Sequence, residues 1–159
     1  MRRAVVPLLL GVALWSCSVP PVSHQLDQAA VGSLELVDMA QRRHAVSEDL
    51  ESGKKVVLVF WETWCESCRE ESGELARAAN AHPELAFYGV IPGPDGAVDD
   101  AVVLETARRW LLPYPQVRDR DLLLTRTFGV AGTPTIVVVG AGGEVVYFDH
   151  EPPADWAAL

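Results

Sequence analysis

The chain is poor in cysteine and histidine, which limits the metal chemistry it can hold. It has three cysteines, Cys17, Cys65 and Cys68, and four histidines that are scattered without ligand spacing. A structural zinc site takes four ligands, and no second cysteine pair is present to complete one around Cys65 and Cys68. We therefore expect no metal. A zinc site and an inert structural disulfide remain the lesser alternatives for this pair.

Basic residues are also scarce. The 13 lysines and arginines are outnumbered by 22 aspartates and glutamates, which gives a net charge of −9 at pH 7. An acidic surface repels the phosphates of nucleic acids and the headgroups of anionic lipids. We therefore expect no nucleic-acid partner and no electrostatic attachment of the protein to a membrane.

The N-terminal apolar run is too short to cross a bilayer. Residues Ala4–Trp15 are interrupted by Pro7 and follow the basic start Met1-Arg2-Arg3. A spanning helix needs about 20 residues, whereas the apolar core of a signal peptide needs only about 7–15 after a basic start. The pattern predicts that residues 1–16 are a signal peptide.

The residues at the end of this run indicate a lipid anchor. Leu14-Trp15-Ser16-Cys17 resembles the lipobox of bacterial lipoproteins, in which the cysteine is lipidated and becomes the new N-terminus. Lipidation of Cys17 also accounts for the odd thiol, a liability in an oxidising compartment. Residues 17–32 are then expected to tether a folded domain over residues 33–159. An ordinary cleaved signal and an uncleaved anchor are the alternatives.

The other two cysteines lie at the junction of a buried strand and a helix. Val56–Phe60 is an apolar run typical of a buried strand, and a polar, helix-forming run continues from Cys68 to about Asn80. Positions three apart share one helix face, so the two sulfurs can reach bonding distance. The helix N-terminus favours a thiolate at Cys65. The pattern predicts dithiol–disulfide exchange, with Cys65 at an exposed tip and Cys68 turned towards the interior.

The remaining patterns predict an α/β fold. Strands are expected at 34–38, 45–46, 85–91, 136–139 and 144–149, helices at 98–112 and 122–127, and a last helix from Ala154. Strands alternate with helices early in the chain, and a hairpin comes late. This order implies a mixed sheet, parallel first and antiparallel at the end, with helices on both faces.

Two motifs resemble those of the TlpA/ResA-like thiol–disulfide oxidoreductases, which are membrane-tethered bacterial proteins with a thioredoxin fold. The first is Phe60-Trp61-x-Thr63-Trp64-Cys65-x-x-Cys68-Arg69-x-Glu71, and the second is Phe128-Gly129-Val130-x-Gly132-Thr133-Pro134-Thr135. Between them, Val98–Asp121 corresponds to the central insert of this group. The resemblance covers residues 34–149. It implies a thioredoxin-like mixed sheet with an N-terminal strand extension and this insert.

The resemblance also assigns client-binding roles. Pro134 aligns with the cis-proline of the family, which faces the cysteine pair and presents its backbone to a bound substrate segment. We expect Thr133 and Trp64 to contact the client as well. These three positions come from the likeness to the family, because a cis bond before proline is found at only about 5–6% of such bonds in folded proteins.

Acidic residues flank the cysteine pair in the sequence. Glu71 matches an acid that the group places near the pair, where it accepts a proton from Cys68 or opposes thiolate formation; a solvated helix residue is the third alternative. Glu66 disfavours a thiolate on Cys65 and so tunes the pair away from strong oxidation. Val59 stands where thioredoxins have a buried acid, so that proton relay is missing.

The resemblance implies an exported, periplasm-facing oxidoreductase that reduces disulfides in client proteins, for example in cytochrome c maturation. The Cys65–Cys68 disulfide is the only redox group expected, with no other cofactor. A thiol transporter in the membrane is the implied electron donor, and the lipid on Cys17 is the implied membrane contact. Two alternatives remain: an oxidant that donates its disulfide, and a thioredoxin-fold binding module without turnover.

Overall fold

The fold is built around a five-stranded mixed sheet. The structure is a computed structural model, and it describes residues 31–159. The predicted signal peptide, the lipidation site Cys17 and almost all of the predicted tether lie outside the described residues. The elements are β1 (Glu35–Val37), β2 (Arg43–Ala45), α2 (Val46–Glu51), β3 (Lys55–Phe60), α3 (Glu66–Ala81), β4 (Leu85–Pro92), α4 (Asp100–Arg109), β5 (Gln116–Asp119), α5 (Leu123–Phe128), β6 (Thr135–Val139), β7 (Val145–Asp149) and a 3-10 turn at Trp156–Ala158.

Strand order explains why β3 is so apolar. The order across the sheet is β5-β4-β3-β6-β7, so β3 lies in the middle. It pairs in parallel with β4 and antiparallel with β6, and Val59 stands opposite both Gly89 and Ile136. A central strand covered on both faces needs apolar side chains in both directions, and Val56–Phe60 are all buried. The predicted α/β class and mixed sheet are confirmed.

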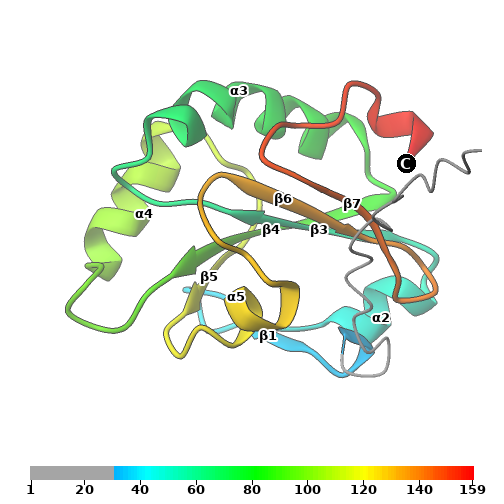
Figure 1. Ribbon diagram of the computed structural model, residues 1–159, viewed down its shortest axis with the longest axis horizontal. Helices are drawn as coiled ribbons and strands as arrows, with labels where there is room; N and C mark the ends of the chain where they lie inside the picture. The colour runs from blue at the N-terminus through cyan, green and yellow to red at the C-terminus, as the bar shows by residue number, and fades with distance from the viewer. Residues whose placement is uncertain (1–30) are drawn as a thin grey trace, which may run out of the picture.

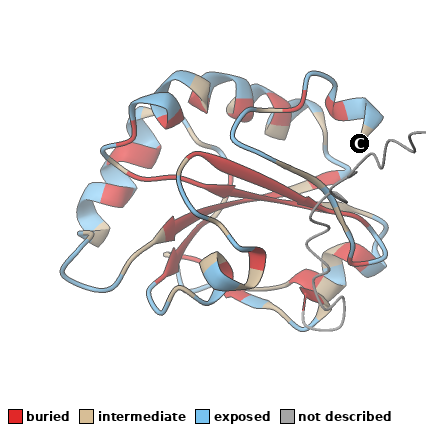
Figure 2. Cartoon of the chain, viewed as in Figure 1, coloured by how far each residue is buried: buried red, intermediate tan, exposed pale blue. Residues whose placement is uncertain are grey.

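Helices cover both faces of the sheet (Figure 1). On one face, Leu75 and Ala78 of α3 pack on alternate residues of β3 and β6, and α4 continues this layer. On the other face, α2 and α5 pack against the opposite residues of the same strands. Figure 2 shows the strands as the buried layer between the exposed outer surfaces of the helices.

The N-terminal strands form a separate two-stranded sheet beside one edge of the main sheet. β1 and β2 form an antiparallel pair, and the turn after β1 contacts β5. Asp38 bridges Val117, and the backbone N–H of Met39 donates to the carbonyl of Gln116 at 2.8 Å. The edge strand β5 therefore has neighbours on both sides, which protects its backbone from pairing with another chain.

Several sequence predictions need correction. Strand β5 was not predicted, because Gln116–Asp119 is short and mostly polar. The second strand ends where the prediction began it, at Ala45, and α2 follows directly. Helix α4 covers Asp100–Arg109 rather than 98–112, with Asp99 as the N-cap that accepts from Ala101 N–H at 2.7 Å. The last helix is a single 3-10 turn that begins at Trp156 instead of Ala154.

Candidate active site

A tryptophan fixes the loop that leads from β3 to the cysteines. The backbone N–H of Trp61 donates to the carbonyl of Val90 at 3.0 Å, and its indole N–H donates to the side chain of Gln116 at 2.9 Å. Its ring packs against Trp110, with ring centroids 5.2 Å apart. Gly89, which pairs with Gln116 in the sheet, leaves room for this hydrogen bond, because a Cβ there would lie 2.1 Å from the Gln116 oxygen and 2.9 Å from the indole nitrogen. These contacts set where the chain leaves the sheet.

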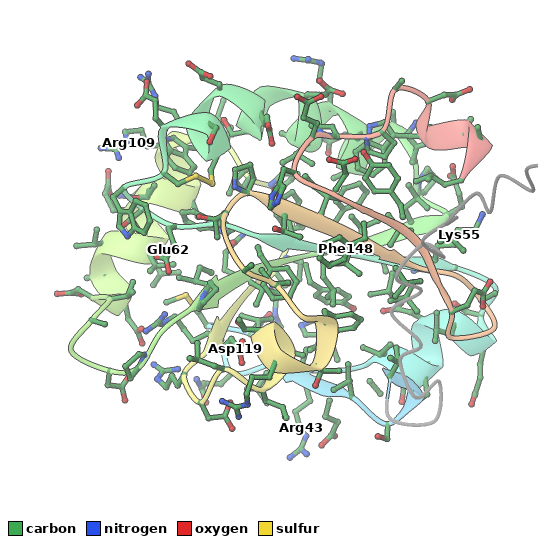
Figure 3. The ribbon with its side chains drawn as sticks, in the orientation of Figure 1. Arg43, Lys55, Glu62, Arg109, Asp119 and Phe148 are labelled. Atoms are coloured by element: carbon green, nitrogen blue, oxygen red, sulfur yellow. A yellow bond between two sulfur atoms is a disulfide. The ribbon has the colours of Figure 1, made fainter. Side chains whose placement is uncertain are left out.

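The two cysteines form a disulfide at the start of α3. Cys65 is the N-cap residue, and its sulfur accepts the backbone N–H of Cys68 at 3.2 Å. The S–S distance is 2.01 Å and the Cα atoms are 5.3 Å apart. Figure 3 shows this bond at the same end of the molecule as Arg109 and Glu62, away from Lys55. Backbone N–H groups at a helix start stabilise a thiolate, so Cys65 suits the role of attacking sulfur.

The expected exposure of Cys65 is wrong. Its exposed fraction is 5%, close to the 3% of Cys68. Both sulfurs belong to an apolar cluster with Val103 and Ala107 of α4, and Trp110 packs against that cluster. Part of this cover comes from Val103 and Ala107, at least 35 residues further along the chain, so the local helix pattern contained no sign of it. Cys68 does turn towards the interior, as its helix stripe predicts.

Pro134 lies beside the disulfide. The Thr133–Pro134 peptide bond is cis, and Pro134 and Cys68 line the same small internal cavity. The carbonyl oxygen of Pro134 is 2.7 Å from Nδ1 of His150, at the end of β7. His150 was not predicted as a site residue, because nothing in the sequence links it to a proline 16 residues earlier. The imidazole fixes the orientation of the carbonyl next to the cis bond.

Glu71 is half-buried on α3. One carboxyl oxygen, Oε2, is buried and has no hydrogen-bond partner within residues 31–159. Burial raises the pKa of Glu71 to about 7, with further upward contributions from Glu151, Glu74 and Glu70, whereas His150 lowers it. A carboxyl group with a pKa near neutral can both take up and release a proton under ordinary conditions. This position differs from that of a solvated helix residue.

Glu66 differs from Glu71 in its surroundings. It is exposed in the first turn of α3 and forms an ion pair with Arg69, three residues on. An exposed pair of this kind contributes little to stability, but it places a negative charge near Cys65.

A third acid, Glu62, was not predicted as a site residue. Its exposed fraction is only 8%, and its Oε2 has no hydrogen-bond partner in the described part of the chain. Burial raises the pKa of Glu62, while the charge of Arg118 and the backbone N–H of Thr63 lower it in part. The carbonyl of Glu62 accepts the backbone N–H of Cys65 at 3.1 Å. The only available sequence signal was its position next to the buried strand, between Trp61 and Thr63.

Two surface hollows meet at Trp64, which is 77% exposed. We name the first the Arg109 hollow; it has a volume of about 460 Å³ and is lined by Thr63, Trp64, Cys65, Glu66, Arg69, Arg109 and Trp110. We name the second the Glu62 hollow; it has a volume of about 210 Å³ and is lined by Glu62, Trp64, Pro92, Thr125, Val130, Ala131, Gly132 and Thr133. The predicted contact residues Trp64 and Thr133 therefore lie together at the surface, next to the disulfide.

Residues 31–159 contain no cluster of three or more histidine, cysteine, aspartate or glutamate side chains placed to hold a metal ion. Over the same range, none of the helices combines the length and the apolar character needed to span a membrane.

The mixed sheet, the disulfide at the start of α3 and the adjacent cis-proline define a thioredoxin-fold protein. The family model described as the AhpC/TSA family matches residues 28–148. The chain belongs to this family.

Two sequence relatives are similar over different shares of the chain. The thiol–disulfide oxidoreductase ResA of Geobacillus thermodenitrificans is 30% identical over 150 residues, which cover 91% of this chain and 83% of that protein. The soluble secreted antigen MPT53 of Mycobacterium tuberculosis is 28% identical over 103 residues, 64% of this chain. The match spans only 57% of the length of MPT53.

Solved structures share the fold at lower identity. A secreted Mycobacterium tuberculosis disulfide oxidoreductase homologous to Escherichia coli DsbE superposes with a TM-score of 0.68 at 22% identity, covering 82% of this chain and 98% of that one. The structure of Mycobacterium tuberculosis dsbF gives a TM-score of 0.66 at 24% identity, covering 79% of this chain and 89% of that one. Both likenesses support the thioredoxin fold.

Proposed function

We propose that the protein is a thiol–disulfide oxidoreductase that reduces disulfides in exported client proteins. The observation that carries this proposal is the Cys65–Cys68 disulfide at a helix start, beside cis-Pro134 and next to the surface formed by Trp64 and Thr133. The likeness to ResA supports the same chemistry.

The proposed reaction moves two electrons from the enzyme to the client. In the reduced enzyme the thiolate of Cys65 attacks a client disulfide, forms a mixed disulfide and releases one client thiolate. Cys68 then attacks the sulfur of Cys65, which forms the Cys65–Cys68 disulfide and releases the second client thiolate. Glu71 accepts the proton of Cys68 in this step. A dithiol donor, proposed to be a membrane thiol transporter, then reduces the enzyme again.

The acidic surroundings favour the reducing direction. Glu66 lies in the first turn of α3 directly after Cys65, and it carries a negative charge that pairs with Arg69. Negative charge near a sulfur raises the cost of a thiolate, and a pair with poorly stabilised thiolates gives up electrons more readily than a strong oxidant does. A reductase of this kind could act in cytochrome c maturation, where the cysteines that attach haem must first be reduced, and we propose these cysteines as one target.

The direction is tested by the reduction potential of the Cys65–Cys68 couple, measured by equilibration in defined thiol buffers. We expect a value near that of thioredoxin, about −270 mV. A value near about −120 mV, as for a strong oxidant, would reverse the direction and make the protein a disulfide donor.

The roles of the two sulfurs are tested by trapping. Cys68→Ala is expected to accumulate mixed disulfides with clients, because the second step cannot occur, whereas Cys65→Ala should trap none. Equal trapping by both variants contradicts the assigned roles. No turnover in a disulfide-reduction assay, with partner binding retained by the double Cys→Ser variant, would identify a binding module instead.

We further propose that a lipid on Cys17 holds the domain at a bacterial membrane on its periplasmic side. Mass spectrometry of the membrane-extracted protein tests this proposal. A diacylglyceryl mass on Cys17, lost in Cys17→Ser, supports it, and an unmodified Cys17 contradicts it.

A further inference from the structure

Glu62 is a buried carboxyl group for which the proposed disulfide exchange has no use. It is more than nine-tenths buried, and its Oε2 atom has no partner among residues 31–159. The Oε2 atom has lost its hydration without gaining a hydrogen bond in return, which is costly for the folded protein when the carboxyl group is charged. A buried polar atom without a partner in a native fold calls for a physical reason, and a ligand that supplies the missing contact is one such reason.

The charge of Arg118 acts on Glu62, but Arg118 does not bind it. The three nitrogens of this guanidinium donate at 2.8–3.3 Å to one carboxylate and three backbone carbonyl groups: Asp100, Ile91, Gly93 and Val98. Each nitrogen therefore has another partner. Glu62 receives a favourable field from Arg118 without a hydrogen bond.

The position of Glu62 relates it to client binding. The Glu62 hollow includes Trp64, which precedes Cys65, and Thr133, which precedes cis-Pro134. A client segment that lies along Thr133 with its cysteine at Cys65 therefore passes this hollow. Pro92 and Val130 give the hollow apolar walls, and Glu62 is its one charged group. Such a site fits a long side chain with an apolar stem and a cationic head.

We propose that the Glu62 hollow binds a lysine or arginine side chain of the client, from a residue close to the client's reactive cysteine. The stem packs on Pro92 and Val130, and the charged head pairs with the carboxylate of Glu62. This inference rests on the proposed function, since its occupant is a client segment.

The two hollows beside Trp64 carry opposite charges, and this difference favours one orientation of a bound client segment. The Arg109 hollow carries Arg69 and Arg109, of which Arg69 is paired with Glu66. A basic client side chain is repelled there and attracted on the Glu62 side. A neutral apolar side chain fits the walls of the Glu62 hollow but leaves the carboxylate without a partner, and an acidic one is repelled by it.

The test uses peptide disulfides that differ at one residue near the cysteine. Lysine, norleucine or glutamate is placed one or two positions away on either side, so that norleucine keeps the apolar stem without the charge. We expect the wild-type kcat/KM for the best-placed lysine to exceed that for norleucine about tenfold, as for one charge-assisted hydrogen bond. Glu62→Gln should reduce this ratio to near one.

Glu66→Gln is the matched control. It removes the same charge close to Cys65 but lies in the Arg109 hollow, so the preference for lysine should remain. A wild-type enzyme without a preference for lysine overturns the proposal. A preference that Glu62→Gln retains, or that Glu66→Gln abolishes, overturns it as well.

Binding of the same peptides with serine in place of cysteine separates this inference from the proposed function. Isothermal titration of these peptides requires no exchange. A Glu62-dependent preference for lysine without any disulfide reduction supports the hollow and contradicts the oxidoreductase. Reduction at equal rates for all peptides, with equal binding of the serine forms, supports the oxidoreductase and overturns the hollow.

Discussion

Asp38 and Glu62 are both buried carboxyl groups, but the protein surrounds them in opposite ways. Asp38, at the edge next to β5, is 2% exposed and accepts hydrogen bonds from the backbone N–H groups of Ala40 and Arg42, from the Arg42 guanidinium and from His44, all at 2.8–3.0 Å. Burial alone would raise the pKa of Asp38, but the hydrogen bonds of His44 and Arg42 outweigh it and lower that pKa to about 2. The pKa of Glu62 is raised, because burial dominates there.

This difference separates acids that stabilise the fold from acids that cost it stability. An acid whose charged form is fully hydrogen-bonded favours the folded state, whereas an acid with an unpartnered oxygen favours unfolding once it is ionised. The two described acids with a buried, unpartnered oxygen are Glu62 and Glu71. Both are close to Cys65 and Cys68 in the sequence, on the loop before the pair and on the helix after it. The two acids of the candidate active site therefore lower the stability of the folded state when they are ionised.

The largest expected effect comes from Asp38→Asn. It removes the charge that Arg42 and His44 bind, and it leaves at least one donor without an acceptor. We expect the free energy of unfolding at pH 7 to fall by about 2 kcal/mol, as when a hydrogen bond to a buried charged group is lost. Urea denaturation measures this loss. Glu35→Gln, which removes an exposed acid paired with Arg43, is the control and should unfold as the wild type does.

Acid titration sharpens the same comparison. The folded pKa of Asp38 lies below the usual value of 3.8, so its charge contributes stability that is complete above pH 3.8 and is lost as the pH falls through about 2. The difference in stability between wild type and Asp38→Asn should therefore narrow over this window. A difference that stays constant down to pH 2 would show that Asp38 acts through packing rather than charge.

Glu62→Gln is expected to act in the opposite direction. The amide keeps the shape of the side chain and removes the unpaired charge, so we expect the free energy of unfolding to rise by about 1 kcal/mol at pH 7. Urea denaturation of the oxidised protein measures it. A loss of stability in this variant would mean that the attraction of Arg118 outweighs burial, and the contrast with Asp38 would then disappear.

Glu71→Gln has the smallest expected effect, and its pH dependence is the informative feature. The folded pKa of Glu71 is raised from 4.5 to about 7, so the wild type loses stability as the pH rises from 4.5 to 7. The free energy of unfolding of Glu71→Gln should equal that of the wild type below pH 4.5. Above pH 7 it should exceed the wild-type value by less than about 1 kcal/mol, because solvent screens the charge at a half-exposed site.

Glu51→Gln removes the same charge from an exposed position on α2 and serves as the matched variant for Glu71→Gln. Stability is measured for both over pH 4 to 8. If the two variants show the same dependence on pH, the effect of Glu71 comes from net charge and not from its burial.

The parts of the fold that depend on local sequence patterns were predicted from the sequence. Val56–Phe60 and 136–139 are apolar enough to identify as buried strands, and the cysteine spacing identified the start of α3. Strand β5 escaped notice because partners outside the strand bury its polar residues. Gln116 accepts the indole N–H of Trp61, and Asp119 accepts the backbone N–H groups of Leu124 and Thr125.

The site residues that belong to local motifs were predicted, and those whose environment depends on distant parts of the chain were not. Cys65, Cys68 and Pro134 belong to motifs whose residues are close together in the chain. The burial of Cys65 depends on α4, and the environment of Glu62 depends on Arg118 and the loop before Pro134. Long-range packing decides whether a glutamate near an aromatic residue is solvated or buried, and spacing along the chain contains no information about it.

The guanidinium of Arg118 has a consequence for redesign of the protein. By holding the carbonyls of Ile91, Gly93 and Val98 together with Asp100, it fastens both ends of the segment that leads into α4 to strand β5. The segment from 93 to 112 is therefore anchored to β5 at its start, and it supplies Arg109 and Trp110 from outside the sulfur-bearing unit β3–α3. Replacements of this segment that keep Asp100 would keep its attachment to β5, whereas replacements of Val103, Ala107 or Trp110 would also change the apolar cover of the two sulfurs.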